Sequence, residues 1–486
     1  MLTHIKRLFK HSVIYGLFET VSRGTGFLLM FLYLHIPLTD SQIGDRTSLY
    51  VASAFLGLFC TLGLNNAFLR YFMEDEYRHK KDVILTTSIV FTLLVGCSFL
   101  LITMFWGEIA SSLITGSTEY VYVTRLLFII LILDTIVIYP TLILRAEKRF
   151  AYFSLISGMR FVLFIGMNAF LVWFLGRGVR GIFEANLLVV ACIAAMFFPI
   201  YRRYLCGRIS FSVLKRMLMF GIPTIFTVFA MRIIDFSDRV IILRFLGNAM
   251  LGQYAYAYQL GMVGIMVFVN SFHVAWQPFF LSLKEKYNDR EIYSRVATYY
   301  AMFIGMVFLG IVLFRELLFS IYAPGRPLSL ANIIPFIAFS YVVYGFYIIM
   351  LPGLYIREKT MYLPLATFSG AALNLGLNFF FIPKFGLIGA AYTTIIAYVV
   401  MVSVLYYISR SIYLVRYEFK RLWTVLLLTS ATIALSFLYK PAAPVLKYGY
   451  YCSLCCLPLL FYCFSSFLTL EEKLPLYTQF RKILPF

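Results

Sequence analysis

The sequence predicts an all-α polytopic integral membrane protein with about 14 transmembrane helices. Three observations lead to this class. Apolar side chains make up 62% of the 486 residues and charged side chains only 13%, whereas soluble domains carry about 25% charged residues. The mean hydropathy is +0.86, which excludes a disordered chain. Apolar runs long enough to cross a bilayer also recur from one end of the chain to the other.

The predicted crossings follow from a window of about 19 residues. They lie near 12–36, 46–70, 83–106, 120–144, 150–175, 181–201, 217–236, 253–281, 296–322, 332–356, 362–382, 387–409, 422–439 and 448–470. The first run has no small-residue cleavage site, so we expect it to remain as a crossing rather than to act as a signal peptide. We expect the stretch 237–251 to lie at the membrane interface rather than to span the bilayer.

Basic residues are distributed unevenly between the predicted loops. The chain has 42 Lys and Arg against 22 Asp and Glu, for a net charge of +20. With the N-terminus in the cytoplasm, roughly 28 basic residues fall in cytoplasmic segments and roughly nine on the opposite side, as the positive-inside rule requires. We therefore expect both termini in the cytoplasm and anionic phospholipid against the basic loops. No single face concentrates the charge, so nucleic acid is not an expected partner.

An internal repeat predicts the domain organisation. The shift that superposes Gly44 on Gly252 also superposes Gly178 on Gly386, and transporter folds are commonly built from such repeats. The prediction is two parallel six-helix lobes around a central cavity, with an appended helix pair. The predicted boundaries are 1–205 for the N-lobe, 206–410 for the C-lobe, and 411–486 for the extra pair and the cytoplasmic tail.

Charged residues inside the predicted membrane segments are the first candidates for function, because each costs about 2.5–3.5 kcal/mol to insert. Arg23 lies in the first crossing, with Glu19 one turn earlier. Arg232 lies in the seventh crossing, with Asp235 one turn later. Two arginines facing each other across the lobes would suit phosphate oxygens. The alternative is two self-neutralised pairs that only hold helices together.

Polar side chains at helical spacing are further candidates for the cavity. Asn270, His273 and Gln277 share one face of the eighth crossing, and Asn374 and Asn378 lie one turn apart in the eleventh. Ligand contact and hydrogen bonding between helices both remain open for these residues.

A transporter driven by a proton or sodium gradient needs an acid that ionises or pairs differently in its two states. Asp134, Asp235 and Asp238 are the candidates for this coupling acid, and Glu184 is a fourth carboxylate, near the outer end of the sixth crossing. Asp134 has no basic neighbour within one helical turn, so its presence in the membrane has no local explanation.

No metal site or cofactor is expected. Cys452, Cys455 and Cys456 have a metal-like spacing, but the surrounding Leu, Pro and Phe favour small apolar fillers. No predicted loop exceeds about 20 residues, which leaves no room for a soluble catalytic domain. The sequence therefore predicts a transporter rather than an enzyme.

Two motifs resemble a known family. The first begins Asp238-Arg239-Val-Ile-Ile-Leu-Arg-Phe-Leu246-Gly247, and the second runs from Asn374-Leu-Gly-Leu-Asn378 to Gly386-Leu-Ile-Gly389. They are similar to the polysaccharide transporter family, the O-antigen and capsule flippases of the multidrug/oligosaccharidyl-lipid/polysaccharide (MOP) exporter superfamily.

The resemblance implies translocation of an undecaprenyl-pyrophosphate-linked oligosaccharide across the bacterial cytoplasmic (inner) membrane by alternating access. The oligosaccharide would be an O-antigen, capsule or exopolysaccharide repeat unit. Basic cavity residues engage the head group in this family, and Arg23 and Arg232 match by location. The resemblance also implies polysaccharide polymerase and chain-length machinery as partners. The acids beside both arginines depart from a purely basic cavity.

Two other transporter functions stay open. A lipid II-type flippase for peptidoglycan precursors shares the fold and the substrate chemistry. A multidrug or cation antiporter of the same superfamily would usually have 12 helices and a cavity dominated by carboxylates, which fits this sequence less well.

Overall fold

The computed structural model describes residues 28–29, 32–33, 38–147, 149–205, 207–283, 289–439, 443–464 and 467. These residues form helices and contain no strand, which confirms the predicted all-α class. Eleven of the described helices are long and apolar enough to cross a membrane, or up to 12 if one bent pair counts as a single span. The chain is therefore a multi-pass membrane protein. The first predicted crossing falls almost entirely outside the described residues, so the count of 14 stays a prediction.

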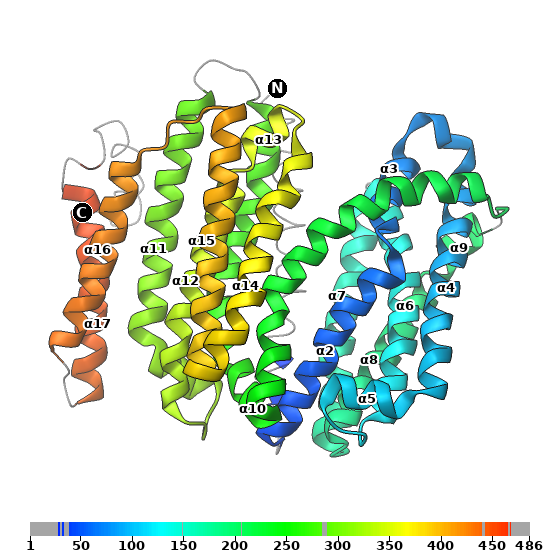
Figure 1. Ribbon diagram of the computed structural model, residues 1–486, viewed down its shortest axis with the longest axis horizontal. Helices are drawn as coiled ribbons and strands as arrows, with labels where there is room; N and C mark the ends of the chain where they lie inside the picture. The colour runs from blue at the N-terminus through cyan, green and yellow to red at the C-terminus, as the bar shows by residue number, and fades with distance from the viewer. Residues whose placement is uncertain are drawn as a thin grey trace.

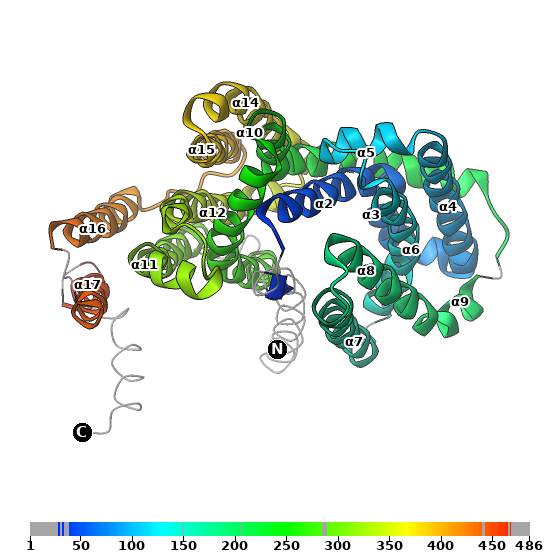
Figure 2. The same ribbon diagram turned by 90° about the horizontal axis from the view of Figure 1, so that it is seen from below.

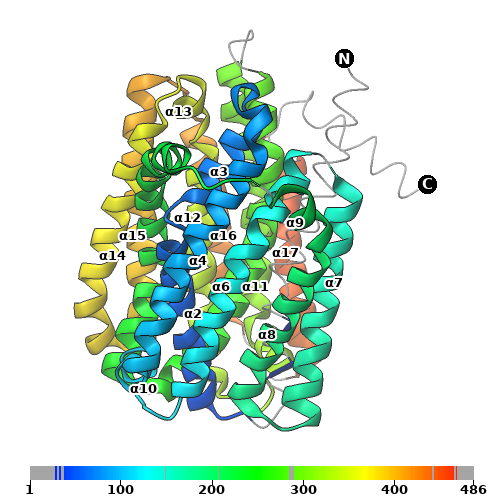
Figure 3. The ribbon, with the colours of Figure 1, turned by 90° about the vertical axis from the view of Figure 1, so that its right-hand side faces the viewer.

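The helices gather in two groups that stand side by side (Figure 1). Within each group they run roughly along one direction, as the view from the side shows (Figure 3). The first group comprises α2 (Asp40–Thr61), α3 (Leu64–Met73), α4 (Lys81–Phe105), α5 (Gly107–Thr115), α6 (Val121–Ala146), α7 (Phe150–Asn168), α8 (Gly178–Met196) and α9 (Phe198–Tyr204). The bent pair that counts as one span is α2 and α3, which meet at 45°.

The second group holds the C-terminal half of the chain. It comprises α11 (Asp289–Tyr322), α12 (Ile334–Ile349), α13 (Pro352–Ile356), α14 (Leu363–Phe385), α15 (Leu387–Ile412), α16 (Phe419–Leu438) and α17 (Pro444–Phe464). The last two helices contact α11 at the outer edge of this group (Figure 2). The two groups follow the order of the predicted lobes, whose residue boundaries stay a prediction.

The longest helix, α10 (Phe211–Ser282), joins the two groups. Its 72 residues would extend to roughly 100 Å if straight, well beyond the ~30 Å hydrocarbon core. The helix breaks at Gly247, whose φ of 83° favours glycine. We call residues 211–246 the first arm and residues 248–282 the second arm. The stretch 237–251, expected at the interface, is thus helical on both sides of Gly247.

The two groups meet where α2 packs against α10, and we call this contact the seam. A Cβ atom on Gly44 would lie 2.0 Å from the carbonyl oxygen of Asn248. A Cβ atom on Gly252 would lie 1.9 Å from the carbonyl oxygen of Asp40. The shift that carries Gly44 onto Gly252 also carries Asp40 onto Asn248, so the two close contacts are reciprocal. A two-fold relation between repeats produces such self-complementary contacts.

The outer surface carries large apolar side chains, among them Phe105, Phe174 and Leu438. A soluble monomer rarely exposes so much apolar area. Facing lipid, the same side chains meet a solvent as apolar as themselves. A network of buried polar side chains lies instead between α10, α12, α14 and α15.

Candidate functional site

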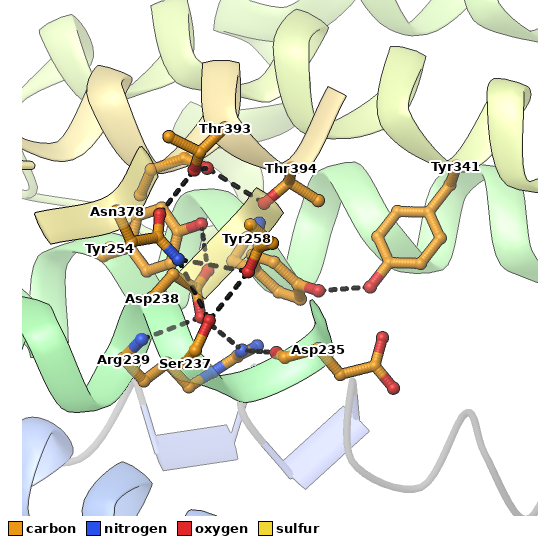
Figure 4. Close-up of polar contacts among 12 residues, drawn as sticks. Asp235, Ser237, Asp238, Arg239, Tyr254, Tyr258, Tyr341, Asn378, Thr393 and Thr394 are labelled. Atoms are coloured by element: carbon orange, nitrogen blue, oxygen red, sulfur yellow. Dashed lines mark hydrogen bonds and ion pairs between the residues drawn. The ribbon is translucent and has the colours of Figure 1, made fainter. Parts of the chain in front are cut away.

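A buried ion pair lies at the end of the first arm of α10 (Figure 4). Asp238 is fully buried, and the side chain of Arg239 is 10% exposed. Their charged groups approach to 3.2 Å, and the hydroxyl of Tyr254 donates a 2.6 Å hydrogen bond to Asp238. Charges this deep are stable only when paired and hydrogen-bonded. Asp238 is therefore neutralised locally.

Aromatic rings enclose the other partner of this pair. The guanidinium of Arg239 lies 4.0 Å from the centre of the Tyr258 ring, a close cation–π contact. The hydroxyl of Tyr258 is hydrogen-bonded to that of Tyr341 on α12. Arg239 also donates to the backbone carbonyl of Asp235. These contacts hold the guanidinium between Asp238, the Asp235 carbonyl and the Tyr258 ring.

Side-chain amides extend the cluster toward α14 and α15 (Figure 4). Ser237 donates a 2.7 Å hydrogen bond to Oδ1 of Asn374, and Nδ2 of Asn378 donates to Ser237 at 3.0 Å. Thr393 donates to Oδ1 of Asn378. Of the two interpretations left open for Asn374 and Asn378, the structure shows hydrogen bonding between helices. The buried network comprises Ser237, Asp238, Arg239, Tyr254, Tyr258, Tyr341, Asn374, Asn378 and Thr393.

Arg232 and Asp235 lie beside this network but differ from it in exposure. Both side chains are partly exposed. Asp235 accepts a 3.1 Å hydrogen bond from the hydroxyl of Tyr398 on α15, and Arg232 lies 5.6 Å from the ring centre of Phe236. No ion pair within the described chain joins the two charged groups, so the alternative interpretation, a self-neutralised pair, does not describe this state.

Phe236 places Arg232 at the seam. Its ring packs 6.2 Å from that of Phe55 on α2, and Phe55 also contacts Phe229 on α10 at 5.9 Å. Arg232 therefore offers a guanidinium near the contact between the two groups. The other predicted pair, Arg23 and Glu19, lies outside the described residues.

The remaining polar candidates of α10 stand apart from the buried network. Asn270, His273 and Gln277 lie on the second arm, where Gln277 is exposed and the other two are partly exposed. None of the three is a member of the network. All three lie within one helix, where this spacing places them on a common face, and their function stays a prediction.

Asp134, which had no local explanation, finds its partner on another helix. Arg160 on α7 donates a 2.8 Å hydrogen bond to its carboxylate, and the two side chains are 46% and 36% exposed, respectively. Glu184 is likewise paired, with Arg177 at 2.6 Å. The sequence could not show the partner of Asp134, because only the packing of α6 against α7 brings it near.

The Asp134–Arg160 pair borders a cavity in the first group. Its volume is about 480 Å³, and residues of α2, α6, α7 and α8 line it. We call it the N-terminal pocket. Its polar lining consists of Tyr50, Ser53, Asp134, Thr141, Ser157, Arg160 and Asn186.

A cluster of polar contacts joins the two groups at one end of the seam. Asp40, at the start of α2, pairs with Arg326 at 2.5 Å. It also accepts hydrogen bonds from Tyr256 at 2.7 Å and from Gln253 at 3.1 Å. We call these four residues the Asp40 lock. Beside it, Asn248 on α10 donates a 2.5 Å hydrogen bond to Asp45 on α2. Residues of both groups therefore hold this end of the seam together.

Sequence reasoning missed the Asp40 lock, since Asp40 and Arg326 fall in predicted loops and read as surface charges. The tyrosines of the buried network were missed for a similar reason: 19% of the chain is aromatic, and periodicity does not separate a hydrogen-bonded tyrosine from a lipid-facing one. The reciprocal glycines of the repeat were the available signal for the seam.

Comparison with known proteins agrees with this architecture. The family described as "Polysaccharide biosynthesis protein" matches residues 38–350. No curated protein matches the chain.

Three solved structures show the fold. The structure titled "Lipid II flippase MurJ, inward closed conformation" has a TM-score of 0.66 at 15% identity, over 90% of this chain and 98% of that one. An inward-facing multidrug resistance MATE family transporter of the MOP superfamily has a TM-score of 0.58 at 16% identity, over 86% of this chain and 94% of that one. The third structure is a MOP superfamily transporter from Pyrococcus furiosus, whose title reports a binding pocket of reverse polarity. It has a TM-score of 0.55 at 15% identity, over 85% of this chain and 96% of that one.

The family match agrees with the predicted family, and the fold that the predicted superfamily implies is confirmed. With its match over residues 38–350 and its MOP-type fold, the chain belongs to the polysaccharide biosynthesis protein family.

Proposed function

We propose that this protein is a flippase for an undecaprenyl-pyrophosphate-linked oligosaccharide, an O-antigen, capsule or exopolysaccharide repeat unit. It carries this lipid across the bacterial inner membrane by alternating access, with both termini in the cytoplasm. The family match supports a role in polysaccharide assembly, and the fold supports movement of the two lobes. In the predicted topology, the Asp40 lock lies at the extracytoplasmic end.

Arg232 is the observation that carries the proposal. Within the described chain no hydrogen bond or ion pair holds its guanidinium, which lies at the seam and is partly exposed. A guanidinium donates two parallel hydrogen bonds to phosphate oxygens. Arg239 cannot take this role, because Asp238 and Tyr258 already hold it. Arg23 is the second proposed contact, from the predicted first crossing.

We further propose that a proton or sodium gradient drives transport through Asp235. Of the three candidate acids, Asp134 and Asp238 are ion-paired. Among the residues that the structure describes, only the hydroxyl of Tyr398 donates a hydrogen bond to the carboxylate of Asp235, which stands one turn from Arg232. A bound pyrophosphate and an ionised Asp235 compete for the same arginine, so a cation on the carboxylate would favour substrate binding. Anionic phospholipid at the basic loops, the polymerase and the chain-length machinery are the proposed partners.

A cellular test uses bacteria from which the gene has been deleted. Wild-type protein and the variants Arg232→Ala, Arg232→Lys and Arg208→Ala are produced from a plasmid, and surface glycan is measured along with the amount of inserted protein. Arg208 is an exposed arginine before α10 and serves as the control. We expect Arg232→Ala to abolish surface glycan. Arg232→Lys should restore only part of it, because the lysine ammonium cannot make the two parallel hydrogen bonds of a guanidinium. Normal glycan with Arg232→Ala would overturn the proposal.

A lipid II-type flippase is the second candidate, favoured by the similarity to the lipid II flippase structure. The same strains separate the two functions. Loss of surface glycan in cells that grow normally supports the oligosaccharide, whereas cell lysis with intact glycan supports the peptidoglycan precursor.

A further inference from the structure

We infer that the N-terminal pocket is a subsite for the glycan portion of the lipid-linked substrate, separate from the arginine that engages its pyrophosphate. This inference rests on the proposed function and deepens it. It starts from the size of the cavity, which at about 480 Å³ falls within the usual range of about 300–1,000 Å³ for ligand pockets.

The polar groups of the pocket have hydrogen-bonding capacity to spare. The Asp134–Arg160 contact joins Oδ1 to Nη2, which leaves the second carboxylate oxygen and the other guanidinium N–H groups for a ligand. Both side chains are more than one-third exposed. No hydrogen bond within the described chain uses the side chains of Ser157 or Asn186, which also line the pocket. Sugar hydroxyls both donate and accept, so they match this mixture of groups.

The charge of the pocket favours a neutral ligand over an anionic one. Asp134 and Arg160 cancel each other at 2.8 Å, and an anion would have to compete with the carboxylate. The rest of the lining includes the rings of Tyr50, Phe161 and Phe164. Aromatic side chains provide large apolar contact surfaces, which suit the C–H faces of sugar rings. A glycan fits this combination better than a pyrophosphate does.

The position of the pocket relates it to the seam and to the direction of transport. Tyr50 of the pocket and Phe55 of the seam lie five residues apart on α2, about 7.5 Å along the helix axis. The lining also runs from Asp134 in the middle of α6 to Leu144 near its end. That end is opposite to the Asp40 lock and cytoplasmic in the predicted topology. A substrate loading from the cytoplasm would thus meet the pocket and Arg232 on the same passage.

Binding to the purified full-length protein in nanodiscs tests the subsite. The first probe is undecaprenyl pyrophosphate, which has no sugar. The second is the undecaprenyl-pyrophosphate-linked oligosaccharide extracted from bacteria that lack this gene. The variants are Asn186→Ala and Ser157→Ala, and the matched control is Ser98→Ala, an exposed serine on α4 that bonds only to its own helix. Thermophoresis gives the dissociation constants, and gel filtration confirms that each variant is folded.

We expect wild-type protein to bind the oligosaccharide-linked lipid more tightly than the sugar-free lipid. Asn186→Ala and Ser157→Ala should each weaken binding of the oligosaccharide-linked lipid about threefold to tenfold, the effect of one lost hydrogen bond. Binding of the sugar-free lipid should not change, and Ser98→Ala should match wild type.

Two results would overturn the subsite: equal affinity of wild type for both lipids, or variants that weaken both lipids equally or neither. Failure of the proposed function gives a different pattern. If Arg232→Ala binds both lipids as tightly as wild type while Asn186→Ala still discriminates between them, the glycan subsite stands and the pyrophosphate role of Arg232 falls.

Discussion

The Asp40 lock predicts that a single substitution favours the state in which the two groups are separated. Arg326→Ala removes the 2.5 Å ion pair with Asp40 and the 3.1 Å hydrogen bond to the carbonyl of Leu38. The two paired side chains are 23% and 19% exposed, so solvent screens part of the attraction. Hydrogen bonds to charged groups contribute about 1.5–3 kcal/mol when buried. After this discount, we expect Arg326→Ala to destabilise the closed lock by about 1–2 kcal/mol.

This loss should favour the state in which the lock is open by about fivefold to thirtyfold. Spin labels on cysteines introduced at Ser41 and Ala249, in a background without native cysteines, would report the separation by double electron–electron resonance. Both positions are exposed and lie beside the lock, one on α2 and one on the second arm of α10. Arg326→Ala should increase the population of long distances, and Arg326→Lys should increase it less.

The matched control is Arg177→Ala, which breaks a 2.6 Å ion pair with Glu184 inside the first group. This substitution should leave the distances between Ser41 and Ala249 unchanged. The reasoning fails if Arg326→Ala gives the wild-type distance distribution, or if Arg177→Ala shifts the distribution as much as Arg326→Ala does.

The remaining predictions concern the seam and the acids. Gly44→Ala should destabilise the closed seam by about 1–3 kcal/mol and lower the thermal unfolding midpoint. The control Gly166→Ala, whose added Cβ atom meets open space, should leave the midpoint unchanged. Equal midpoints for the two variants would contradict the reciprocal contact. Asp238→Asn should cost about 3–5 kcal/mol, because it leaves a buried arginine without its partner, and thermal unfolding of the purified variant measures this. Asp235→Asn should unfold like wild type yet flatten the dependence of transport on an ion gradient. If Asp134→Asn flattens that dependence instead, the coupling acid lies in the first group.

Much of the architecture could be predicted from the sequence, because a bilayer imposes strict rules on length and polarity. Helix segments such as 387–409 are specified by about 20 apolar residues in a row, and α15 is found at Leu387–Ile412. The repeat located Gly44 and Gly252, which make the closest backbone contacts of the seam. Helix ends near Gly247 were harder to place, because both arms of α10 continue through residues that are less apolar.

The candidate site was less accessible to sequence reasoning, because pairing between distant helices leaves no periodic signal. Spacing along the chain shows no basic partner for Asp134, but Arg160 on the next helix neutralises it. The sequence does not separate Asp238 from Asp235, but Asp238 is fully buried with Arg239 and Asp235 is partly exposed. Composition and spacing identified these charges as unusual. Only the packing of the helices separates those that hold the fold from those that can meet a substrate.

Direct translocation by the purified protein is the measurement that tests the central claim. Proteoliposomes are loaded with the undecaprenyl-pyrophosphate-linked oligosaccharide, labelled on its glycan, and a membrane-impermeant glycosidase outside reports the label that has crossed. Wild-type protein should expose the label faster than empty liposomes do, and Arg232→Ala should return the rate to that of empty liposomes. A wild-type rate no faster than that of empty liposomes, or an Arg232→Ala rate equal to wild type, would contradict the account.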